Sequence, residues 1–430
     1  MQTTTLSTLL NRAPWNQPDK PGALFLGSYP PRECGIATFT EDVRDAYDGL
    51  GSTSSDVIAV TDAGADYAYP SCVIGEIQRD HRASYIEAAR LANAHPSDVV
   101  NIQHEYGLYG GERGQMLIDF LSRLRKPVVL TLHTTLPNPD EAMLHVTREL
   151  ANRADRIIVL AYTARSILES EYGIDGRKIR VVLHGAPDVP LRDSRHFKKA
   201  LGLQDRMVLA TFGLISRGKG IEYVIDALPA VFERHPDAMY LLLGETHPVV
   251  RKQEGESYRE SLRQRVVELG IEDRVRFVDH YLTDDEIVAH LLATDVYVSP
   301  SLDPHQIVSG TLSYAVACGR LVIATEYLYA KELLADGRGM TVPFRDSGAL
   351  AGAINLALDD PGLRAEMERN AYRYGRQMTW RRVARRYRHA FVEVTERAGD
   401  ALVDHGAREL WSSALKRHAT SVANPIQDTP

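Results

Sequence analysis

Two series of alternating apolar strands and amphipathic helices, divided by one polar segment, constrain the fold of this chain more than any other feature. Short, continuous apolar runs predict buried strands that begin at Ala23 in the first series and at Val208 in the second. Further predicted strands of the first series are residues 57–60, 99–103, 128–132, 157–160 and 181–183, and the second series predicts 208–212, 239–243, 275–277, 296–298 and 321–325. Apolar strands that alternate with helices indicate parallel sheets covered on both faces. We therefore predict an α/β fold of two doubly wound, Rossmann-like domains.

The polar segment at residues 186–200 is the strongest candidate for the linker between the two domains, because it holds Pro187 and Pro190. We predict an irregular N-terminal arm at 1–22, a first domain at 23–190 and a second domain at 191–375. Helices at 376–418 are expected to pack back on the first domain, followed by a mobile tail at 419–430. In this arrangement the carboxyl ends of both sheets face one central cleft, which is where ligands of such folds bind.

Composition argues against several classes of protein. The chain of 430 residues has a formal net charge of -7, which gives no general attraction to nucleic acid. Its three cysteines lie far apart without a CxxC pair, so neither a disulfide framework nor a zinc site is indicated, and a cytoplasmic protein is expected. We find no basic leader followed by a long apolar stretch, and no apolar run long enough to span a membrane. The arginine-rich stretch from Arg369 to Arg388 is typical of a solvated helix face, and membrane association is left open without being indicated.

The loop after the first predicted strand contains Gly35, which could let the backbone approach a phosphate or a sugar closely. A tight turn that needs a glycine explains the same residue equally well. Thr38 and Glu41 have the spacing of a capping box and predict the start of the next helix. The absence of a GxGxxG pattern argues against a dinucleotide cofactor.

Two further predicted strands of the first domain end in histidines. The strand that ends near Gln103 is followed by His104, Glu105, Tyr106 and Tyr109, a mixture of groups that suits the hydroxyls and C–H faces of a sugar acceptor. For His104 alone, a satisfied core or loop histidine is the favoured reading. His133 ends the next strand at the same edge of the sheet, and two such histidines favour a functional site in the cleft.

Two basic residues and the start of a predicted helix indicate that the second domain binds phosphate. Arg217 and Lys219 flank a glycine in the turn after the strand at 208–212, and their spacing is not that of a P-loop. A diphosphate leaving group needs cations and free helix N–H groups to stabilise its charge. Ser309, Gly310 and Thr311 open a predicted helix and could bind the same diphosphate, although an ordinary N-cap is the alternative.

From Leu24 to about Trp380 the order of these elements resembles the retaining family 4 glycosyltransferases of GT-B fold. The resemblance is strongest in LATFGLISRGKGIEYVIDALPAV, RVRFVDHYLTDDEIVAHLLATDVYVSPS and ACGRLVIATEYLYAKELLADGRGMTVPFRD. It implies that the loop around Gly35 closes over donor and acceptor, that His133 lies beside the transferred sugar, and that Lys219 binds the donor phosphates. It also implies attack by the acceptor hydroxyl on the same face that the leaving group departs from, without a side-chain nucleophile.

The sequence departs from the family pattern at three positions. Leu214 stands where the family usually has an arginine, and we expect Arg217 to supply the missing charge. Gln306 and Tyr314 stand where the family has two glutamates, and both are predicted donor contacts. Gln306 can still hydrogen-bond a sugar hydroxyl, but Tyr314 cannot accept two ribose hydroxyls as a carboxylate would. The two replacements leave the donor undetermined and suggest a different donor site that could include Asp303.

We therefore predict a retaining glycosyltransferase that moves a hexose from a nucleotide-diphosphate sugar, of GDP-mannose or UDP-glucose type, to a hydroxyl acceptor. No metal and no cofactor are predicted, because cationic residues already meet the phosphates. A nucleotide-sugar epimerase or hydrolase on the same scaffold, using His104, Glu105 and His133 as acid and base, is the main alternative. A sugar-nucleotide-binding protein without activity is a further alternative, which the replaced glutamates at 306 and 314 motivate. The sugar, the base, the acceptor, the linkage and the oligomeric state stay open.

Overall fold

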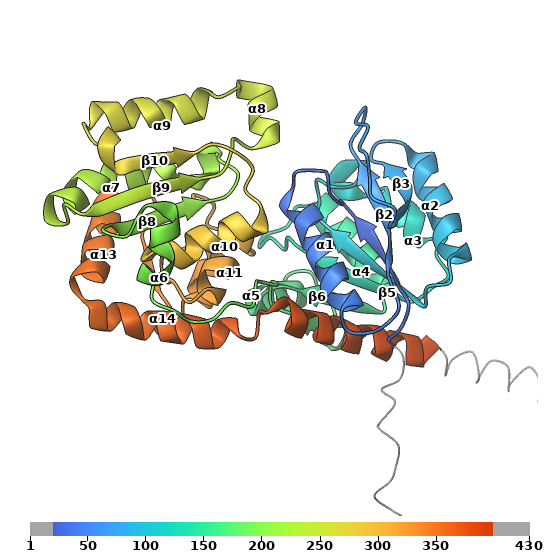
Figure 1. Ribbon diagram of the computed structural model, residues 1–430. Helices are drawn as coiled ribbons and strands as arrows, with labels where there is room; N and C mark the ends of the chain where they lie inside the picture. Colours follow the sequence, from blue (N-terminus) through green and yellow to red (C-terminus); the bar gives the residue numbers. More distant parts are fainter. Residues whose placement is uncertain (1–19, 399–430) are drawn as a thin grey trace, which may run out of the picture.

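The computed structural model describes residues 20–398, which form two α/β domains with a parallel sheet each (Figure 1). The first sheet has seven strands in the order β3-β2-β1-β4-β5-β6-β7, and the second has six in the order β10-β9-β8-β11-β12-β13. All strand pairs are parallel, as in β1, where Phe25 lies between Val57 of β2 and Asn101 of β4. This confirms the predicted fold of two doubly wound domains.

The elements of the first domain follow the predicted alternation. Its strands are β1 (Ala23–Gly27), β2 (Asp56–Thr61), β3 (Val73–Gln78), β4 (Val99–His104), β5 (Val128–Leu132), β6 (Arg156–Val159) and β7 (Ile179–Val181). Its helices are α1 (Gly35–Asp48), α2 (Arg82–Ala94), α3 (Leu117–Leu121), α4 (Glu141–Arg153) and α5 (Tyr162–Ser170). Strands β1, β4 and β5 are buried at every residue, because helices cover both faces of the sheet.

The second domain repeats this architecture. Its strands are β8 (Met207–Phe212), β9 (Ala238–Leu243), β10 (Val275–Val278), β11 (Val296–Ser299), β12 (Leu321–Thr325) and β13 (Met340–Val342). Its helices are α6 (Arg195–Lys198), α7 (Ile221–Arg234), α8 (Pro248–Glu254), α9 (Ser257–Glu268), α10 (Asp284–Ala293), α11 (Gly310–Ala317), α12 (Leu328–Leu333), α13 (Ser347–Asp359) and α14 (Pro361–Gly375).

Helix α1 begins earlier than the sequence predicted. Its N-cap is Cys34, whose Sγ accepts a hydrogen bond from the Ala37 amide at 3.4 Å, so Thr38 and Glu41 lie inside the helix. The predicted capping box is therefore wrong. A thiol is not among the preferred N-cap residues, which is why the sequence pattern pointed to Thr38 instead.

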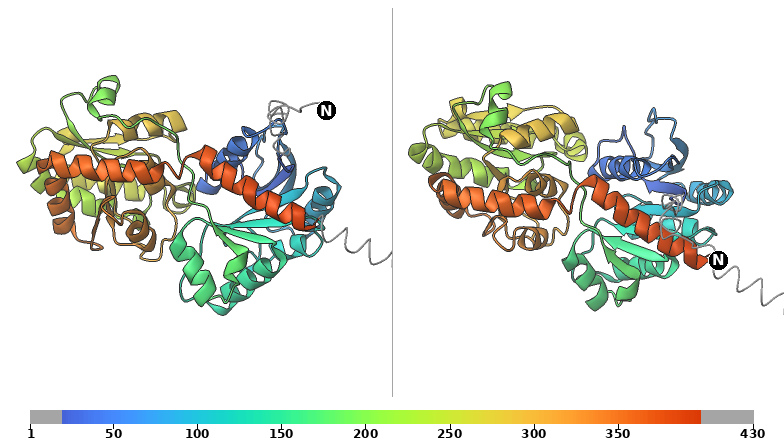
Figure 2. Two further views of the ribbon diagram at one scale, coloured as in Figure 1. Left: turned by 90° about the horizontal axis from the view of Figure 1, so that it is seen from below. Right: turned by 60° about the horizontal axis from the view of Figure 1, so that its bottom comes forward.

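A helix over residues 380–398 leaves α14 and returns to the first domain, so that the two helices lie along one side of both domains (Figure 2). Tyr387 and Phe391 of this helix are fully buried against Phe25 and Tyr47. Its residues Arg381, Arg382 and Arg385 are exposed. Residues 399–418 of the predicted C-terminal helices, the tail at 419–430 and residues 1–19 of the predicted arm lie outside the described residues. No helix within 20–398 is long and apolar enough to cross a bilayer.

The two chain crossings between the domains lie side by side. The Ala186 amide donates to the Met378 carbonyl at 2.8 Å, and the Trp380 amide donates to the Ala186 carbonyl at 3.1 Å. Gly185 packs so closely on the Trp380 indole that a Cβ at this position would lie 2.1 Å from the ring. The segment 184–186 and the start of the last helix therefore form one packed unit beside the interdomain cleft.

We predict that Gly185→Ala destabilises the protein, because the added methyl group must displace Trp380 from its packing. Overpacking of this kind lowers the free energy of unfolding by about 1–3 kcal/mol, measurable by urea denaturation. Gly352→Ala is the matched control, since a Cβ there meets no atom within 4 Å in helix α13. Alanine should raise the stability there by about 0.4–1 kcal/mol. Equal effects of the two substitutions would contradict the packing seen at Gly185.

Candidate active site

A cavity of about 890 Å³ lies between the two domains, at the carboxyl ends of both sheets. The first domain contributes the loop between β1 and α1, the first half of α1, and Glu105, His133 and His184. The second domain contributes the turns after β8 and β9, residues 281–287 and the start of α11. This is the position at which doubly wound folds bind ligands.

Lys219 supplies a positive charge to the wall that the second domain forms. Its side chain lines the cavity, and no hydrogen bond or ion pair to its ammonium group occurs within residues 20–398. Burial lowers the pKa of Lys219, because the charged form loses water without gaining a partner. An anion bound in the cavity would offset that cost.

Close backbone packing shapes the same wall. Gly213 has φ 127° and Gly244 has φ 122°, a region of backbone conformation that favours glycine. A Cβ on Gly244 would lie 2.4 Å from the Gly213 carbonyl oxygen, and one on Gly213 would lie 3.1 Å from the Thr311 methyl group. The turns after β8 and β9 are thereby held against the N-terminus of α11.

Arg217 does not line the cavity, which corrects its predicted place beside Lys219. Its Nε donates to Glu254 Oε2 at 3.1 Å, its guanidinium lies 5.2 Å from the Tyr258 ring centroid, and its side chain is 60% exposed. Arg217 and Lys219 belong to one turn of 3₁₀-helix. With three residues per turn, positions i and i+2 point in different directions, so only one of the two can face the cleft.

The start of helix α11 forms the adjoining part of the wall. Gly310, Thr311 and Tyr314 line the cavity, as does Gly35 on the opposite side, where a Cβ would meet no atom within 4 Å. Ser309 is the N-cap, and its hydroxyl accepts from the Leu312 amide at 3.3 Å. It is buried and lies outside the cavity wall, contrary to its predicted contact with the donor.

Two other predicted donor contacts also point elsewhere. Gln306 Oε1 accepts from the Ser301 hydroxyl at 2.7 Å, and its Nε2 donates to the Val308 carbonyl at 3.0 Å. Asp303 is exposed and accepts from the His305 amide at 2.9 Å. Both side chains thus stabilise their own loop, which corrects the prediction that they contact the donor in this conformation.

His133 faces Lys219 from the first domain. It is 8% exposed, and its ring meets the Phe39 ring edge-on with centroids 4.7 Å apart. Gln103 Nε2 donates to Asn101 at 2.6 Å, so Gln103 Oε1 is the acceptor for His133 Nε2 at 2.8 Å. Burial lowers the pKa of His133 to about 3. The imidazole is therefore neutral at pH 7, and its Nδ1 can accept a hydrogen bond from a hydroxyl group.

Only one of the four predicted acceptor residues lines the cavity. Glu105 does so, and burial raises its pKa although the Tyr106 amide donates to it at 2.9 Å. His104 is fully buried, and its ring stacks on the ring of Tyr109. The Tyr109 hydroxyl donates a hydrogen bond to the Gln103 carbonyl at 2.8 Å. The Tyr106 hydroxyl forms a hydrogen bond with the Thr147 hydroxyl. These three placements are corrections. Successive side chains of an extended strand point to opposite sides, so Glu105 and His104 cannot both face the cleft.

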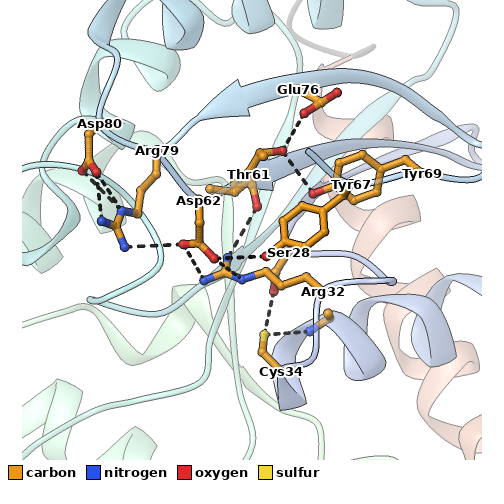
Figure 3. Close-up of polar contacts among 12 residues, drawn as sticks. Ser28, Arg32, Cys34, Thr61, Asp62, Tyr67, Tyr69, Glu76, Arg79 and Asp80 are labelled. Carbon is orange, nitrogen blue, oxygen red and sulfur yellow. Dashed lines mark hydrogen bonds and ion pairs between the residues drawn. The ribbon is translucent and has the colours of Figure 1, made fainter. Parts of the chain in front are cut away.

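The loop that leads to Gly35 is held by an ion-pair network (Figure 3). Arg32 Nε lies 3.0 Å from Asp62 Oδ2, and Asp62 Oδ1 also accepts from Arg79 at 3.4 Å. At the far end of the loop, Cys34 Sγ lies 3.2 Å from the Ser28 hydroxyl. The loop is thereby fixed to the end of β2, and Gly35 is presented to the cavity from a defined position.

Asp42 and His184 are among the cavity residues that sequence reasoning missed. The Tyr314 hydroxyl donates to Asp42 Oδ2 at 3.2 Å across the cleft, and burial, followed by the charge of Asp284, raises the pKa of Asp42 to about 7. Two weaker contacts also bridge the domains: Thr38 to the Tyr281 hydroxyl at 3.4 Å and Arg251 to Glu33 at 3.8 Å. No local pattern marks Asp42, because its partners come from the other domain.

Comparison with known proteins agrees with this geometry. The model of "Glycosyltransferase Family 4" matches residues 42–188, and that of "Glycosyl transferases group 1" matches residues 193–374. A D-inositol 3-phosphate glycosyltransferase of Acidothermus cellulolyticus is 27% identical over 299 residues, which are 65% of this chain and 64% of that protein. A GDP-mannose-dependent phosphatidylinositol monomannoside mannosyltransferase of Mycolicibacterium smegmatis is 28% identical over 51% of this chain and 57% of its own length.

Solved structures share the fold over nearly the whole described region. Anabaena HepE in complex with UDP and glucose has a TM-score of 0.64 and 20% identity, over 89% of this chain and 99% of that one. The sucrose-phosphate synthase of Thermosynechococcus elongatus has a TM-score of 0.67 and 19% identity, over 86% and 100% of the two chains. The class of this protein follows from its two opposed parallel-sheet domains and from the family models, one of which matches each half of the chain. The chain belongs to the family 4 glycosyltransferases of GT-B fold.

We predict that Asp42→Asn stabilises the protein at pH 8. Because the folded-state pKa of Asp42 is raised, the native carboxyl keeps its proton while the unfolded chain releases it, so stability falls as the pH rises from about 4 to 7. Asparagine removes this cost and keeps an acceptor for the Tyr314 hydroxyl. The free energy of unfolding should rise by about 1–3 kcal/mol at pH 8, and the gain should shrink towards pH 4.

Urea denaturation at the two pH values measures this difference. Asp66→Asn removes one exposed carboxylate away from the cleft and should change stability little at either pH. A loss of stability in Asp42→Asn that is equal at both pH values would contradict the raised pKa.

Proposed function

We propose that this protein is a retaining glycosyltransferase that moves a hexose from a nucleotide-diphosphate sugar to a hydroxyl acceptor. The observation that carries the proposal is the Lys219 ammonium group, which has no partner among residues 20–398, in a cavity whose opposite wall holds the neutral His133. A cation without a counterion suits a bound diphosphate, and a neutral imidazole suits a sugar hydroxyl. The two walls thus suit the diphosphate and the sugar of a nucleotide sugar.

The charge that develops on the leaving group decides which residues assist the transfer. As the bond between the sugar C1 and the phosphate oxygen breaks, negative charge grows on the diphosphate. Lys219 and the backbone N–H groups at the start of α11 are placed to stabilise that charge. Because these groups would meet the phosphates directly, we propose a reaction that uses no metal ion and no cofactor.

The sugar end of the donor would lie against the first domain. His133 Nδ1 can accept from a sugar hydroxyl, and the Glu105 carboxyl group lines the same wall and could bind the acceptor hydroxyl. Transfer with retention follows if the acceptor attacks on the face from which the diphosphate departs. Its hydroxyl proton then passes to a departing phosphate oxygen, and the sugar passes through an oxocarbenium-like state.

The named relatives support a hexose donor of GDP-mannose or UDP-glucose type. One relative is named for its dependence on GDP-mannose, and a structural neighbour was solved with UDP and glucose. Since sequence identity is low in both comparisons, we leave the base open. A thermal-shift screen of GDP, UDP and ADP sugars selects the donor, because a ligand that binds only the folded state raises the melting temperature.

We predict that Lys219→Met lowers kcat/KM far more than Arg217→Met does, although both substitutions remove one cation from the same turn. Loss of Lys219 should lower kcat/KM by about 10²–10³-fold, because it removes a group that stabilises the leaving diphosphate. Loss of Arg217, which pairs with Glu254 outside the cavity, should change kcat/KM by less than about threefold. The melting temperature of Lys219→Met should not fall, since the substitution removes a desolvated charge. Equal losses of activity in the two variants would count against the proposed phosphate site.

The stereochemistry of the product tests the retaining mechanism. Proton NMR of the first product formed from an α-linked donor should show an α-linkage, and a β-linkage would refute retention. Incubation of the donor without an acceptor separates the alternatives: rapid formation of an epimer or of free sugar would indicate an epimerase or a hydrolase. Absence of turnover with every acceptor, despite donor binding, would indicate an inactive binding protein.

A further inference from the structure

His184 is a cavity residue for which the mechanism above has no role. It lies beyond the end of β7, where the chain leaves the first domain, and it is 9% exposed. The aromatic rings of Phe39, Trp380 and Tyr314 surround it, with centroids 5.0, 6.1 and 6.3 Å away. Three elements from both domains therefore fix the orientation of the imidazole.

A single hydrogen bond fixes the tautomer of His184. Its Nδ1 lies 2.7 Å from the Gly185 carbonyl oxygen, and a carbonyl can only accept, so Nδ1 carries the hydrogen. In the neutral ring, Nε2 therefore has a free lone pair. No residue within 20–398 forms a hydrogen bond with Nε2.

Nε2 points to the N-terminus of helix α11. A Cβ on Gly310 would lie 3.1 Å from it, so only the missing side chain of this glycine leaves room for the imidazole. Gly310, Thr311, Lys219 and His184 all line the same cavity. Nε2 thus adjoins the helix N–H groups that the proposed function assigns to the leaving diphosphate.

We propose that His184 binds the donor diphosphate through Nε2 and takes up one proton from solution when the donor binds. The proposal rests on the proposed function, because it assigns a second partner to the same diphosphate. Phosphate oxygens only accept hydrogen bonds at neutral pH, so Nε2 must gain a hydrogen to contact them. The proton enters on binding, no bond of the donor changes in that step, and the proton returns to solution when the nucleoside diphosphate leaves.

The surroundings of His184 agree with a neutral ring in the empty site. Burial lowers its pKa to about 4, while its hydrogen bond to Gly185 opposes this shift. The titratable groups that face it are His133 from the first domain and Tyr314 from α11, and Tyr314 is itself bonded to Asp42. None of these supplies a negative charge in contact with Nε2. A bound diphosphate would supply such a negative charge, and this charge would favour the imidazolium form of His184.

Calorimetric titration with UDP and with GDP at pH 7.5, in two buffers of different ionisation enthalpy, measures the proton taken up on binding. The wild-type protein should take up most of one proton with whichever nucleotide binds. Its affinity should fall up to tenfold as the pH rises from 7.5 to 8.5, as a one-proton linkage requires. His184→Asn should take up almost none, bind the nucleotide at least tenfold more weakly, and lose this pH dependence.

His290→Asn is the matched control for the titration. His290 Nδ1 bonds the Glu286 carbonyl at 2.7 Å, as His184 Nδ1 bonds Gly185, but His290 lies outside the cavity. Its substitution should leave the proton uptake unchanged. Equal uptake in wild type and His184→Asn, or no uptake in wild type with tight binding, would overturn the role of His184 alone. Failure of both nucleotides to bind would overturn the proposed function and this role with it.

Discussion

The rest of the site depends on a desolvated ammonium group that has no counterion in the described part of the chain. Lys219 is held in the cleft by a turn whose glycines allow the strand ends to pack on helix α11. Burial of an unpaired charge costs free energy, and the pKa of Lys219 is lowered accordingly. In the empty protein this cost lowers the free energy of unfolding, and binding of an anionic ligand offsets it. Charge that is placed before the ligand arrives needs no reorganisation during the reaction.

The opposite wall has a different character, because its histidines are neutral. His133 and His184 are both buried among aromatic rings, and burial lowers the pKa of each well below 7. The neutral imidazole of His133 on the first domain and the Lys219 cation on the second give the cleft two distinct walls, and His184 Nε2 adjoins the N-terminus of α11 between them. Asp42 adds a third element, since its raised pKa reflects a carboxyl group confined in the cleft and bonded to Tyr314 of the other domain. These arrangements cost stability and are typical of functional sites.

The sequence predicts the fold and part of the site because both depend on local pattern. Apolar runs located eleven of the thirteen strands within residues 20–398, whereas the partly exposed edge strands β3 and β13 gave no comparable run. Strand ends located Lys219, His133, Glu105, Gly35 and the start of α11 at the cavity. Arg217 was predicted at the cavity but points out of it, because side chains two positions apart in a 3₁₀ turn point in different directions. His104 is buried away from the cavity, because successive side chains of a strand point to opposite sides. Asp42 and His184 could not be found, since their partners come from the other domain or from the hinge.

The central claim is that Lys219 and the N-terminus of α11 hold a diphosphate opposite His133. A crystal structure of the protein with the nucleoside diphosphate selected by thermal shift tests this claim most directly. We expect density for the two phosphates within hydrogen-bonding distance of Lys219 Nζ and of the backbone amides at Gly310 and Thr311. A nucleotide bound elsewhere, with Lys219 still without a partner, would contradict it.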